Sequence, residues 1–564
     1  MTSVSRSGQR GNGRRTSWLD RRLPLVRWVR EADAASYRHD VLAGLTVAAM
    51  LVPQGMAYAA LAGMPPVTGL YASVVPLVVY ALLGTSGQLA VGPVAIVSLL
   101  TASTLAPLAD GDPGTYVALA GMLAVLVGAI QLTLGLLRAG RLTSLLSHPV
   151  VSGFTSAAAI VIATSQLDKL LGIRLGEVEG WVGRVAAIAG GLGGTNLVTL
   201  TVGVVAVALL LVGKRLGNRV PTALLVVAMA TAAVPLLGLE ERGVEVLGHV
   251  PGGFPLPTLP AAPLETVVAL APGALVIALL SYLEGISVAR AVAQRTRDRI
   301  DPDQELIASG AANLAAGVVQ AFPVAGGFSR TAVNHAAGAR TPLASIVTAG
   351  GVLLALLLLA PLFATLPEVV LAAVVLVAVS KLVDVREAVH AWRVERTDGL
   401  ALTITFLATL LIGVELGIGI GIGASLVLSL WRVGVPRLVP HVADHDRARQ
   451  VLQVEGDLLP ASGVHLFDAV ESHIEEAGTD LEVLVLDLSC VPGADLSGIR
   501  ALAAVDESCR GVDVELRLAG LRPGVLGPLR RAHLDERFAG RWSAAEAATV
   551  DAVPGPTEIV TPAR

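Results

Sequence analysis

Long uncharged stretches, separated by short charged segments, dominate the chain up to about residue 434. No Asp, Glu, Lys or Arg occurs at residues 41–109. That run is long enough for three helices of about 20 residues, the length that crosses a bilayer. Similar runs continue to residue 431, so we predict fourteen membrane spans in total. The predicted spans are 41–62, 67–84, 88–107, 114–137, 148–167, 196–213, 220–239, 266–289, 305–321, 326–338, 341–362, 367–381, 398–413 and 415–431.

Basic residues are distributed unevenly between the predicted loops. They follow the even-numbered spans. The charged residues of the predicted loop at 110–114 are all acidic, and the loop at 240–260 has one basic residue, Arg242. Loops that stay in the cytoplasm are rich in Lys and Arg. The pattern therefore predicts that both ends of the chain are cytoplasmic and that the protein lies in the inner (plasma) membrane.

Composition agrees with a polytopic membrane protein. Hydrophobic residues make up 54% of the 564 residues and charged residues only 15%, compared with about 25% charged in soluble domains. The net charge is −4, so nothing indicates a nucleic-acid partner. The two cysteines, Cys490 and Cys509, suit neither a disulfide framework nor a zinc site. The sequence predicts no metal ligands and no cofactor.

Two predicted spans are interrupted by glycine and proline. Residues 321–340 read AFPVAGGFSRTAVNHAAGAR, and residues 84–100 read GTSGQLAVGPVAIVSLL. Non-helical backbone at membrane depth must line a cavity or be buried in protein, and paired interruptions in the two halves of a chain point to a transporter binding site. A helix that begins there directs free N–H groups and a positive dipole end at the cavity. Ordinary Pro/Gly kinks are the alternative interpretation.

Beyond residue 434 the pattern changes to short apolar strands and amphipathic helices. Residues 450–455, 481–489 and 512–518 are predicted strands, and 464–476 and 497–509 are predicted helices. This alternation predicts a small α/β domain with a partly parallel sheet. We predict a cytoplasmic N-terminal arm at 1–39, a membrane domain at 40–434, the α/β domain at 435–546 and a disordered tail at 547–564.

Several of these motifs together resemble the sulfate permease (SulP) family of anion transporters with a C-terminal STAS domain. They are the stretch at 40–73, DVLAGLTVAAMLVPQGMAYAALAGMPPVTGLYAS, then VGPVAIVSLL, SYLEGISVAR, FSRTAV, and VLVLDLSCVPGADLSGIRAL at 483–502. The resemblance covers most of the chain. It implies two inverted seven-span repeats, a core domain of spans 1–4 and 8–11, a gate domain of the other spans, elevator-like movement between them, and a homodimer.

The resemblance also implies an anion site between half-helices three and ten. Its residues would be Gln54, Tyr58, Gly92, Pro93, Val94, Phe328, Ser329 and Arg330. For the four with polar or charged side chains, alternatives stay open. Ser329 would merely cap its helix, Arg330 would anchor at the cytoplasmic surface, Gln54 would bond the carbonyl freed by Pro53, and Tyr58 would only pack. In the STAS loop, Leu496 stands where related anti-sigma-factor antagonists carry a phosphorylatable serine, and Ser497 is expected to cap the next helix.

Glu284 lies in an otherwise uncharged span, and ionisable groups in such positions are functional hypotheses by default. We predict that it takes up the coupling proton when the anion loads near Arg330. Family members with Glu here resemble proton-linked sulfate transporters, whereas sodium-linked bicarbonate transporters tend to carry Asp. A static Glu284–Arg330 ion pair is the alternative.

The sequence thus predicts a secondary active transporter of a small inorganic anion, with sulfate favoured and protons as the coupling ion. Bicarbonate or dicarboxylate transport with sodium or protons, and a passive anion channel, are the alternatives. A regulatory partner at the STAS domain is compatible with the sequence. The sequence contains no constellation of catalytic residues that would predict an enzyme. It also contains no G-x-x-x-x-G-K-[ST] run, the phosphate-binding loop that would indicate ATP-driven transport.

Overall fold

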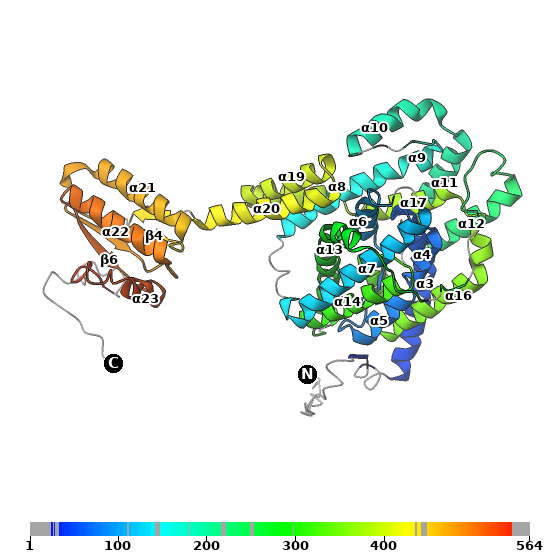
Figure 1. The fold of residues 1–564 in the computed structure, drawn as a ribbon, viewed down its shortest axis with the longest axis horizontal. Helices are drawn as coiled ribbons and strands as arrows, with labels where there is room; N and C mark the ends of the chain where they lie inside the picture. Colours follow the sequence, from blue (N-terminus) through cyan, green and yellow to red (C-terminus); the bar gives the residue numbers. More distant parts are fainter. Residues whose placement is uncertain are drawn as a thin grey trace, which may run out of the picture. The chain divides into compact units, whose positions relative to one another are not determined.

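The fold was analysed in a computed structural model of the chain (Figure 1). It describes residues 24–25, 28, 33–109, 112–140, 147–176, 178, 180–215, 221–248, 253–255, 257–296, 298–434, 437–440 and 448–543. The chain divides into two compact units, Met1–Gly423 and Ala424–Arg564. The first unit is almost entirely helical, and the second is an α/β domain. A mostly helical membrane domain followed by a small α/β domain is the architecture that the sequence predicts.

A helix, or a pair of short helices, matches each of the fourteen predicted spans. Those of the first half are α3 (Ala34–Leu61), α4 (Pro66–Tyr71) with α5 (Val75–Leu83), α6 (Ala95–Leu105), α7 (Pro113–Leu136), α8 (His148–Ser165), α11 (Leu197–Arg215) and α12 (Thr222–Leu237). Those of the second half are α13 (Leu264–Thr296), α14 (Pro302–Val318), α15 (Phe328–Ala336), α16 (Leu343–Phe363), α17 (Glu368–Val379), α19 (Arg396–Leu411) and α20 (Val414–Gly434).

Not every one of these helices is long and apolar enough to be assigned as a membrane span from length and composition alone. Within the described residues, six helices are long and apolar enough to cross a membrane, or seven if the bent pair Gly180–Gly194 and Leu197–Gly213 counts as one. Four apolar helices are shorter, among them Ala95–Leu105 of the first broken segment. Helices that begin or end at membrane depth are necessarily short, so the count of fourteen stays a prediction.

The two broken segments pair with each other. Strand β1 (Val91–Gly92) lies antiparallel to β2 (Ala325–Gly326), with Val91 opposite Gly326. Each strand is followed within three residues by a short helix, α6 after β1 and α15 after β2. Two stretches more than two hundred residues apart in sequence therefore meet as one non-helical crossing in the interior of the helical unit.

Glycines bring helices α7 and α14 into backbone contact. A Cβ added at Gly128 would lie 2.7 Å from the carbonyl oxygen of Gly310, and one at Gly317 would lie 2.5 Å from the carbonyl oxygen of Gly121. Small residues at such contacts let helices pack closely where no hydrophobic effect drives them together. This contact supports the interior against which the broken segments pack.

Some elements of the first unit have no counterpart in the predicted spans. They are α9 (Leu167–Leu171), α10 (Gly180–Gly191), the 3₁₀ turn η2 (Leu192–Gly194) and α18 (Val385–Val394). On α18, Val385, Val389 and Trp392 are exposed at a spacing that places them on one helix face. The sequence at 383–397 predicts an amphipathic helix at the membrane interface, with an ordinary charged loop as the alternative. The structure confirms the helix, and its place at the interface stays a prediction.

The second unit contains a four-stranded sheet in the order β3-β4-β5-β6. The strands are β3 (Arg437–Pro440), β4 (Arg449–Glu455), β5 (Val483–Asp487) and β6 (Glu515–Ala519); the last three run parallel, and β3 is antiparallel to β4. The helices α21 (Pro460–Ala477), α22 (Leu496–Gly511) and α23 (Pro523–Arg531), with the turn η3 (Gly478–Asp480), complete the unit. Strand β3 and helix α23 lie outside the predicted elements.

Two details of the second unit concern carboxylates. The Asp495 side chain accepts a hydrogen bond from Gly498 N and caps α22, so the expectation that Ser497 is the cap was wrong. Asp506 is fully buried and pairs with Arg541 at 2.7 Å and Arg537 at 2.8 Å. Burial raises the pKa of the Asp506 carboxyl, but the hydrogen bonds from Arg541 and Arg537 outweigh this effect and hold the pKa below its ordinary value.

We expect Gly128→Leu to destabilise the helical unit, because the new side chain would have to occupy space filled by the backbone of α14. Overpacking of this kind costs about 1–3 kcal/mol or more. The thermal unfolding midpoint of the purified protein measures the effect. Gly350→Leu is the control, because Gly350 on α16 is exposed and a Cβ there would meet nothing within 4 Å. Equal midpoints for the two variants would contradict the close contact of α7 with α14.

Candidate functional site

A cavity of about 420 Å³ lies inside the helical unit. One wall is formed by α3, α6, α13 and α15, which include both helices that follow the broken segments. The rest of the lining comes from α11, α12 and α17 with the residues after α17. The first group lies within the spans that the resemblance assigns to the core domain and the second within those of the gate domain, and this division stays a prediction. Among the predicted site residues, Gln54, Tyr58, Val94, Glu284, Phe328, Ser329 and Arg330 line this cavity.

The non-helical backbone beside the cavity finds its hydrogen bonds within the protein. Gly327 N donates to the Ala90 carbonyl at 3.0 Å, and Ala90 N donates to the buried Thr331 hydroxyl at 3.1 Å. The side-chain oxygen of Asn313 on α14 accepts a hydrogen bond from Val324 N at 2.8 Å, and the side-chain nitrogen donates to the Val324 carbonyl at 3.2 Å. These contacts meet the requirement that no polar backbone group inside a membrane domain be left to the lipid.

Arg330 lies between the two broken segments. Its side chain is 2% exposed, and Nη1 donates to the Pro93 carbonyl at 2.6 Å. Nε and Nη2 have no hydrogen-bond partner in the part of the chain that the structure describes. A buried guanidinium with unused donors is costly unless a ligand completes it. Burial also excludes the alternative that Arg330 is an anchor at the surface.

Two glycines make room for this guanidinium. A Cβ at Gly327 would lie 2.6 Å from Arg330 Cζ, closer than Cβ atoms approach, and one at Gly92 would lie 3.5 Å from Nη2. The planar group therefore lies against the backbone of both broken segments. Gly92 and Pro93, two of the predicted site residues, are not part of the cavity lining, and they contact Arg330 through their backbone.

The N-termini of α6 and α15 are both free of side-chain caps. The N-cap residues are Val94 and Gly327, so Pro93 lies just before the cap and not at the first helical position that its ring suits. Ser329 is the second residue of α15 and does not cap it. The alternative that its exposed hydroxyl serves merely as a helix cap is therefore removed. Uncapped first-turn N–H groups and the helix dipoles favour an anion. Phe328 is 64% exposed and lines the cavity.

Gln54 and Tyr58 form a polar pair on α3. Gln54 Nε2 donates to the Tyr58 hydroxyl at 3.1 Å, and Gln54 Oε1 has no partner among the described residues. Gln54 thus does not bond the backbone freed by Pro53. Thr46 and Met50 line the same cavity, and the four-residue spacing from Thr46 to Tyr58 places all four on one helix face. The sequence interpretation missed Thr46 and Met50, although this spacing could have identified both as residues that line the cavity.

Glu284 reaches the cavity from α13. The residue is partly buried, and Oε2 is shielded from solvent without a hydrogen-bond partner among the described residues. No carboxylate oxygen of Glu284 lies within 4.0 Å of an Arg330 nitrogen, since the ion pairs of the described chain do not include these two residues. The static ion pair that the sequence left open is absent. The next residue, Gly285, approaches β2, and a Cβ there would lie 3.7 Å from Gly326 N.

The part of the lining that comes from α11, α12, α17 and the residues after α17 was largely missed from sequence. Its residues are mostly apolar, and apolar side chains in a predicted span carry no chemical signal. The wall consists of Leu210, Gly213, Pro221, Thr222, Ala223, Val374, Val377, Ala378, Lys381 and Leu382. Lys381 is the charged member and is exposed. The sequence marks it only as a basic residue at the end of the twelfth predicted span, 367–381.

Comparison with known proteins identifies the chain by two family matches. Residues 37–405 match the sulfate permease family, and residues 440–548 match the STAS domain. The chloroplastic sulfate transporter 4.1 of Arabidopsis thaliana is 33% identical, with 94% of this chain and 82% of the relative covered. A probable sulfate transporter of Mycobacterium tuberculosis is 35% identical, with 91% and 92% covered.

Solved structures share the fold at lower sequence identity. The murine Solute Carrier 26 family member A9 anion transporter, solved in an inward-facing state, aligns with a TM-score of 0.87 at 23% identity, covering 97% of this chain and 96% of that one. The transmembrane domain of the cyanobacterium bicarbonate transporter BicA aligns with a TM-score of 0.60 at 21% identity, covering 70% and 98%. The likeness confirms a mostly helical membrane domain and, for the first of these, the C-terminal α/β domain.

Proposed function

The chain belongs to the sulfate permease family, and from this premise we propose that it is a secondary active transporter that takes up sulfate together with protons. Its relatives are named sulfate transporters. The observation that carries the proposal is Arg330, a buried guanidinium with two unused donor atoms between two uncapped helix N-termini. This arrangement offers fixed positive charge and N–H groups to a small anion without any side chain of opposite charge bonded to it.

The anion would be held mainly by Arg330 and by first-turn N–H groups after Val94 and Gly327. Charge-assisted hydrogen bonds from a guanidinium are strong and suit a tetrahedral oxyanion. The Ser329 hydroxyl and the Gln54 side chain line the same space and would contact the anion's other oxygens. Phe328 and Tyr58 would enclose it. Helix dipoles and backbone donors recognise the charge of an anion more than its chemical identity. The test below therefore also includes bicarbonate.

Proton coupling is assigned to Glu284. It faces the same cavity as Arg330 and has an unused carboxylate oxygen. An ionised Glu284 would repel a doubly charged anion across this low-dielectric space, whereas a protonated Glu284 would not. Loading of sulfate and uptake of a proton would therefore favour each other.

Movement of the site is proposed to follow the division of the cavity walls. The groups expected to bind the anion and the proton lie on α3, α6, α13 and α15, whereas the lining from α11, α12 and α17 is mostly apolar. An apolar wall presents no bonds that must break as the other group of helices slides along it. This supports elevator-like movement of the core helices with their anion. We further propose a location in the inner membrane, with the N-terminus and the STAS domain cytoplasmic, and a homodimer.

The first measurement is uptake of labelled sulfate into proteoliposomes with and without an inward proton gradient. We expect accumulation above equilibrium when the gradient is present, because the proton drives the loaded carrier inward. A parallel series uses labelled bicarbonate with a sodium gradient. Accumulation in that series alone would leave the anion site in place but overturn sulfate and protons. Sulfate movement that never exceeds equilibrium would favour a passive channel.

Arg330→Lys is expected to weaken sulfate binding at least tenfold. Lysine keeps the charge but loses the planar fork that reaches both the Pro93 carbonyl and the cavity, and one charged hydrogen bond is worth about 1.5–3 kcal/mol. Equilibrium binding of labelled sulfate to the purified protein measures the change. Arg290→Lys is the matched control, because Arg290 is exposed near the end of α13. Equal affinity in both variants would remove Arg330 from the site.

Glu284→Gln is expected to abolish stimulation of uptake by a proton gradient while sulfate binding is retained, because glutamine resembles the protonated carboxyl. Uptake and binding are measured over the same pH series, and the variant's binding should lose its dependence on pH. Glu265→Gln on the same helix is the control, since Glu265 is exposed in the first turn of α13. Gradient-driven uptake that survives in Glu284→Gln would move coupling to another group.

A further inference from the structure

Three buried polar side chains connect the helices α7, α13 and α14, which pack against one another (Figure 1). They are Gln131 on α7, Ser281 on α13 and Asn313 on α14, and they are 1%, 2% and 1% exposed. None of them is part of the cavity lining. Polar side chains between membrane helices commonly hold the helices together, so burial alone assigns them no further role. The direction of their hydrogen bonds does.

These side chains form a series of hydrogen bonds that can run in only one direction. The backbone N–H of Val324 can only donate, so Asn313 presents its oxygen Oδ1 to it, at 2.8 Å. The Asn313 nitrogen Nδ2 therefore faces Gln131, whose oxygen Oε1 accepts at 3.0 Å. The Gln131 nitrogen Nε2 then donates to the Ser281 hydroxyl at 2.9 Å. That hydroxyl in turn donates to the Ile277 carbonyl of its own helix.

The two ends of this series lie beside the two groups on which the proposed function depends. Val324 directly precedes β2 and comes six residues before Arg330. Ser281 comes three residues before Glu284, which is about one turn of α13. Gln131 is therefore the middle residue of a link between the segment that leads to the guanidinium and the turn of helix that carries the carboxyl.

Helix α13 and strand β2 also meet directly. A Cβ added at Gly326 would lie 2.8 Å from the Gly285 Cα, closer than Cβ atoms approach. Packing this tight fixes how near the two segments lie, but it contains no directional bond that would prevent one from sliding along the other. The amide of Gln131 supplies such bonds, because its oxygen bonds Asn313 and its nitrogen bonds α13.

We propose that Gln131 is a positioning residue for proton-coupled anion binding. Through Asn313 it fixes the backbone that leads to Arg330. Through Ser281 it fixes the turn of α13 that carries Glu284. The inference rests on the proposed function, since it takes Arg330 as the anion group and Glu284 as the proton group. The interaction of two charges depends on their separation, so a fixed separation sets how strongly proton and anion binding favour each other.

The pH dependence of this site involves other charged and titratable groups besides Glu284. Those on the elements packed against α13, or in the cavity lining, are Tyr58, Tyr116, Asp303, Glu305, Arg330, His335 and Lys381, and α13 itself carries Glu265, Tyr282, Arg290 and Arg295. Of these, Arg330 and Tyr58 interact electrostatically with Glu284. Substitution of Gln131 leaves every one of them in the chain, so a changed pH dependence reports a changed position.

Three variants test this role. Gln131→Met keeps an unbranched side chain but removes its hydrogen bonds, and Asn313 Nδ2 still has two backbone carbonyls as acceptors, so its buried donor is not left unpaired. Ser281→Ala removes only the bond to that hydroxyl. Thr348→Val is the matched control, because Thr348 on α16 is 1% exposed, lies outside the cavity lining and donates to the Gly44 carbonyl of α3 at 3.0 Å.

Two measurements are made on the full-length protein, with thermal unfolding as a check that the folds are comparable. The first is hydrogen–deuterium exchange of residues 321–330 without sulfate. We expect it to be about fivefold faster in Gln131→Met, the factor that one hydrogen bond of average strength contributes. The second is the affinity for labelled sulfate across a pH series. Coupling predicts that the affinity of the unaltered chain changes about fivefold or more across the series.

We expect Gln131→Met to reduce that pH-dependent change by about twofold or more, Ser281→Ala to reduce it less, and Thr348→Val to leave it unaltered. Faster exchange with an unaltered pH dependence would mean that the network only holds helices together, and would overturn the proposal. If Gln131→Met does not fold, a pH dependence in Ser281→Ala equal to that of Thr348→Val overturns it. An unaltered chain that binds no sulfate at any pH would instead overturn the proposed function itself.

Discussion

The structure of the helical unit depends on one constraint, which is that backbone leaving a helix inside a membrane domain must be hydrogen-bonded by protein. The short ladder of β1 with β2 satisfies part of it, and the side chains of Thr331 and Asn313 satisfy more. Arg330 meets the Pro93 carbonyl, the backbone group directly before the α6 cap. Because these partners come from both halves of the chain, the crossing can form only when the halves are packed together.

That constraint also explains why the charged site lies where it does. The groups that stabilise the crossing leave the helix N-termini of α6 and α15 directed at the cavity, and the guanidinium that bonds one segment keeps two donors unused. A side chain at Gly327 would displace the guanidinium, so the same glycine that breaks the helix makes room for the charge. The fold of the crossing and the proposed anion binding therefore rest on the same few residues.

Much of the fold was predictable because hydrophobic runs and breaks are local features of sequence. Each predicted span corresponds to a helix or to a pair of short helices, and the Gly/Pro interruptions marked the crossing correctly. The details that sequence missed depend on contacts distant along the chain. Capping by Asp495 instead of Ser497 is decided by loop geometry, and Lys381 joins the cavity only through the packing of α17. Helix α10, which has 12 residues, was also missed, and the segment Gly180–Gly194 that contains it is bent by 119° from the next helix.

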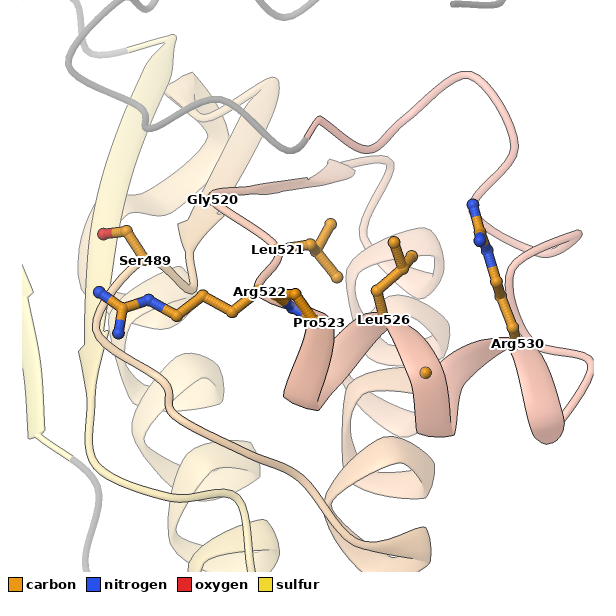
Figure 2. A pocket seen from close by; sticks show the side chains of 8 residues that line it. Ser489, Gly520, Leu521, Arg522, Pro523, Leu526 and Arg530 are labelled. Atoms are coloured by element: carbon orange, nitrogen blue, oxygen red, sulfur yellow. The ribbon is translucent and has the colours of Figure 1, made fainter. Parts of the chain in front are cut away.

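The arginines of the two units differ in how far they are exposed to solvent. Arg330 is 2% exposed, so dissolved salt screens it little, and its cost of burial is offset only when a ligand or backbone carbonyl completes it. In the STAS domain, Arg522 and Arg530 are exposed (Figure 2), and at physiological ionic strength charges beyond about 8 Å are largely screened from each other. Salt therefore screens the positive charge of Arg330 less than that of Arg522 and Arg530.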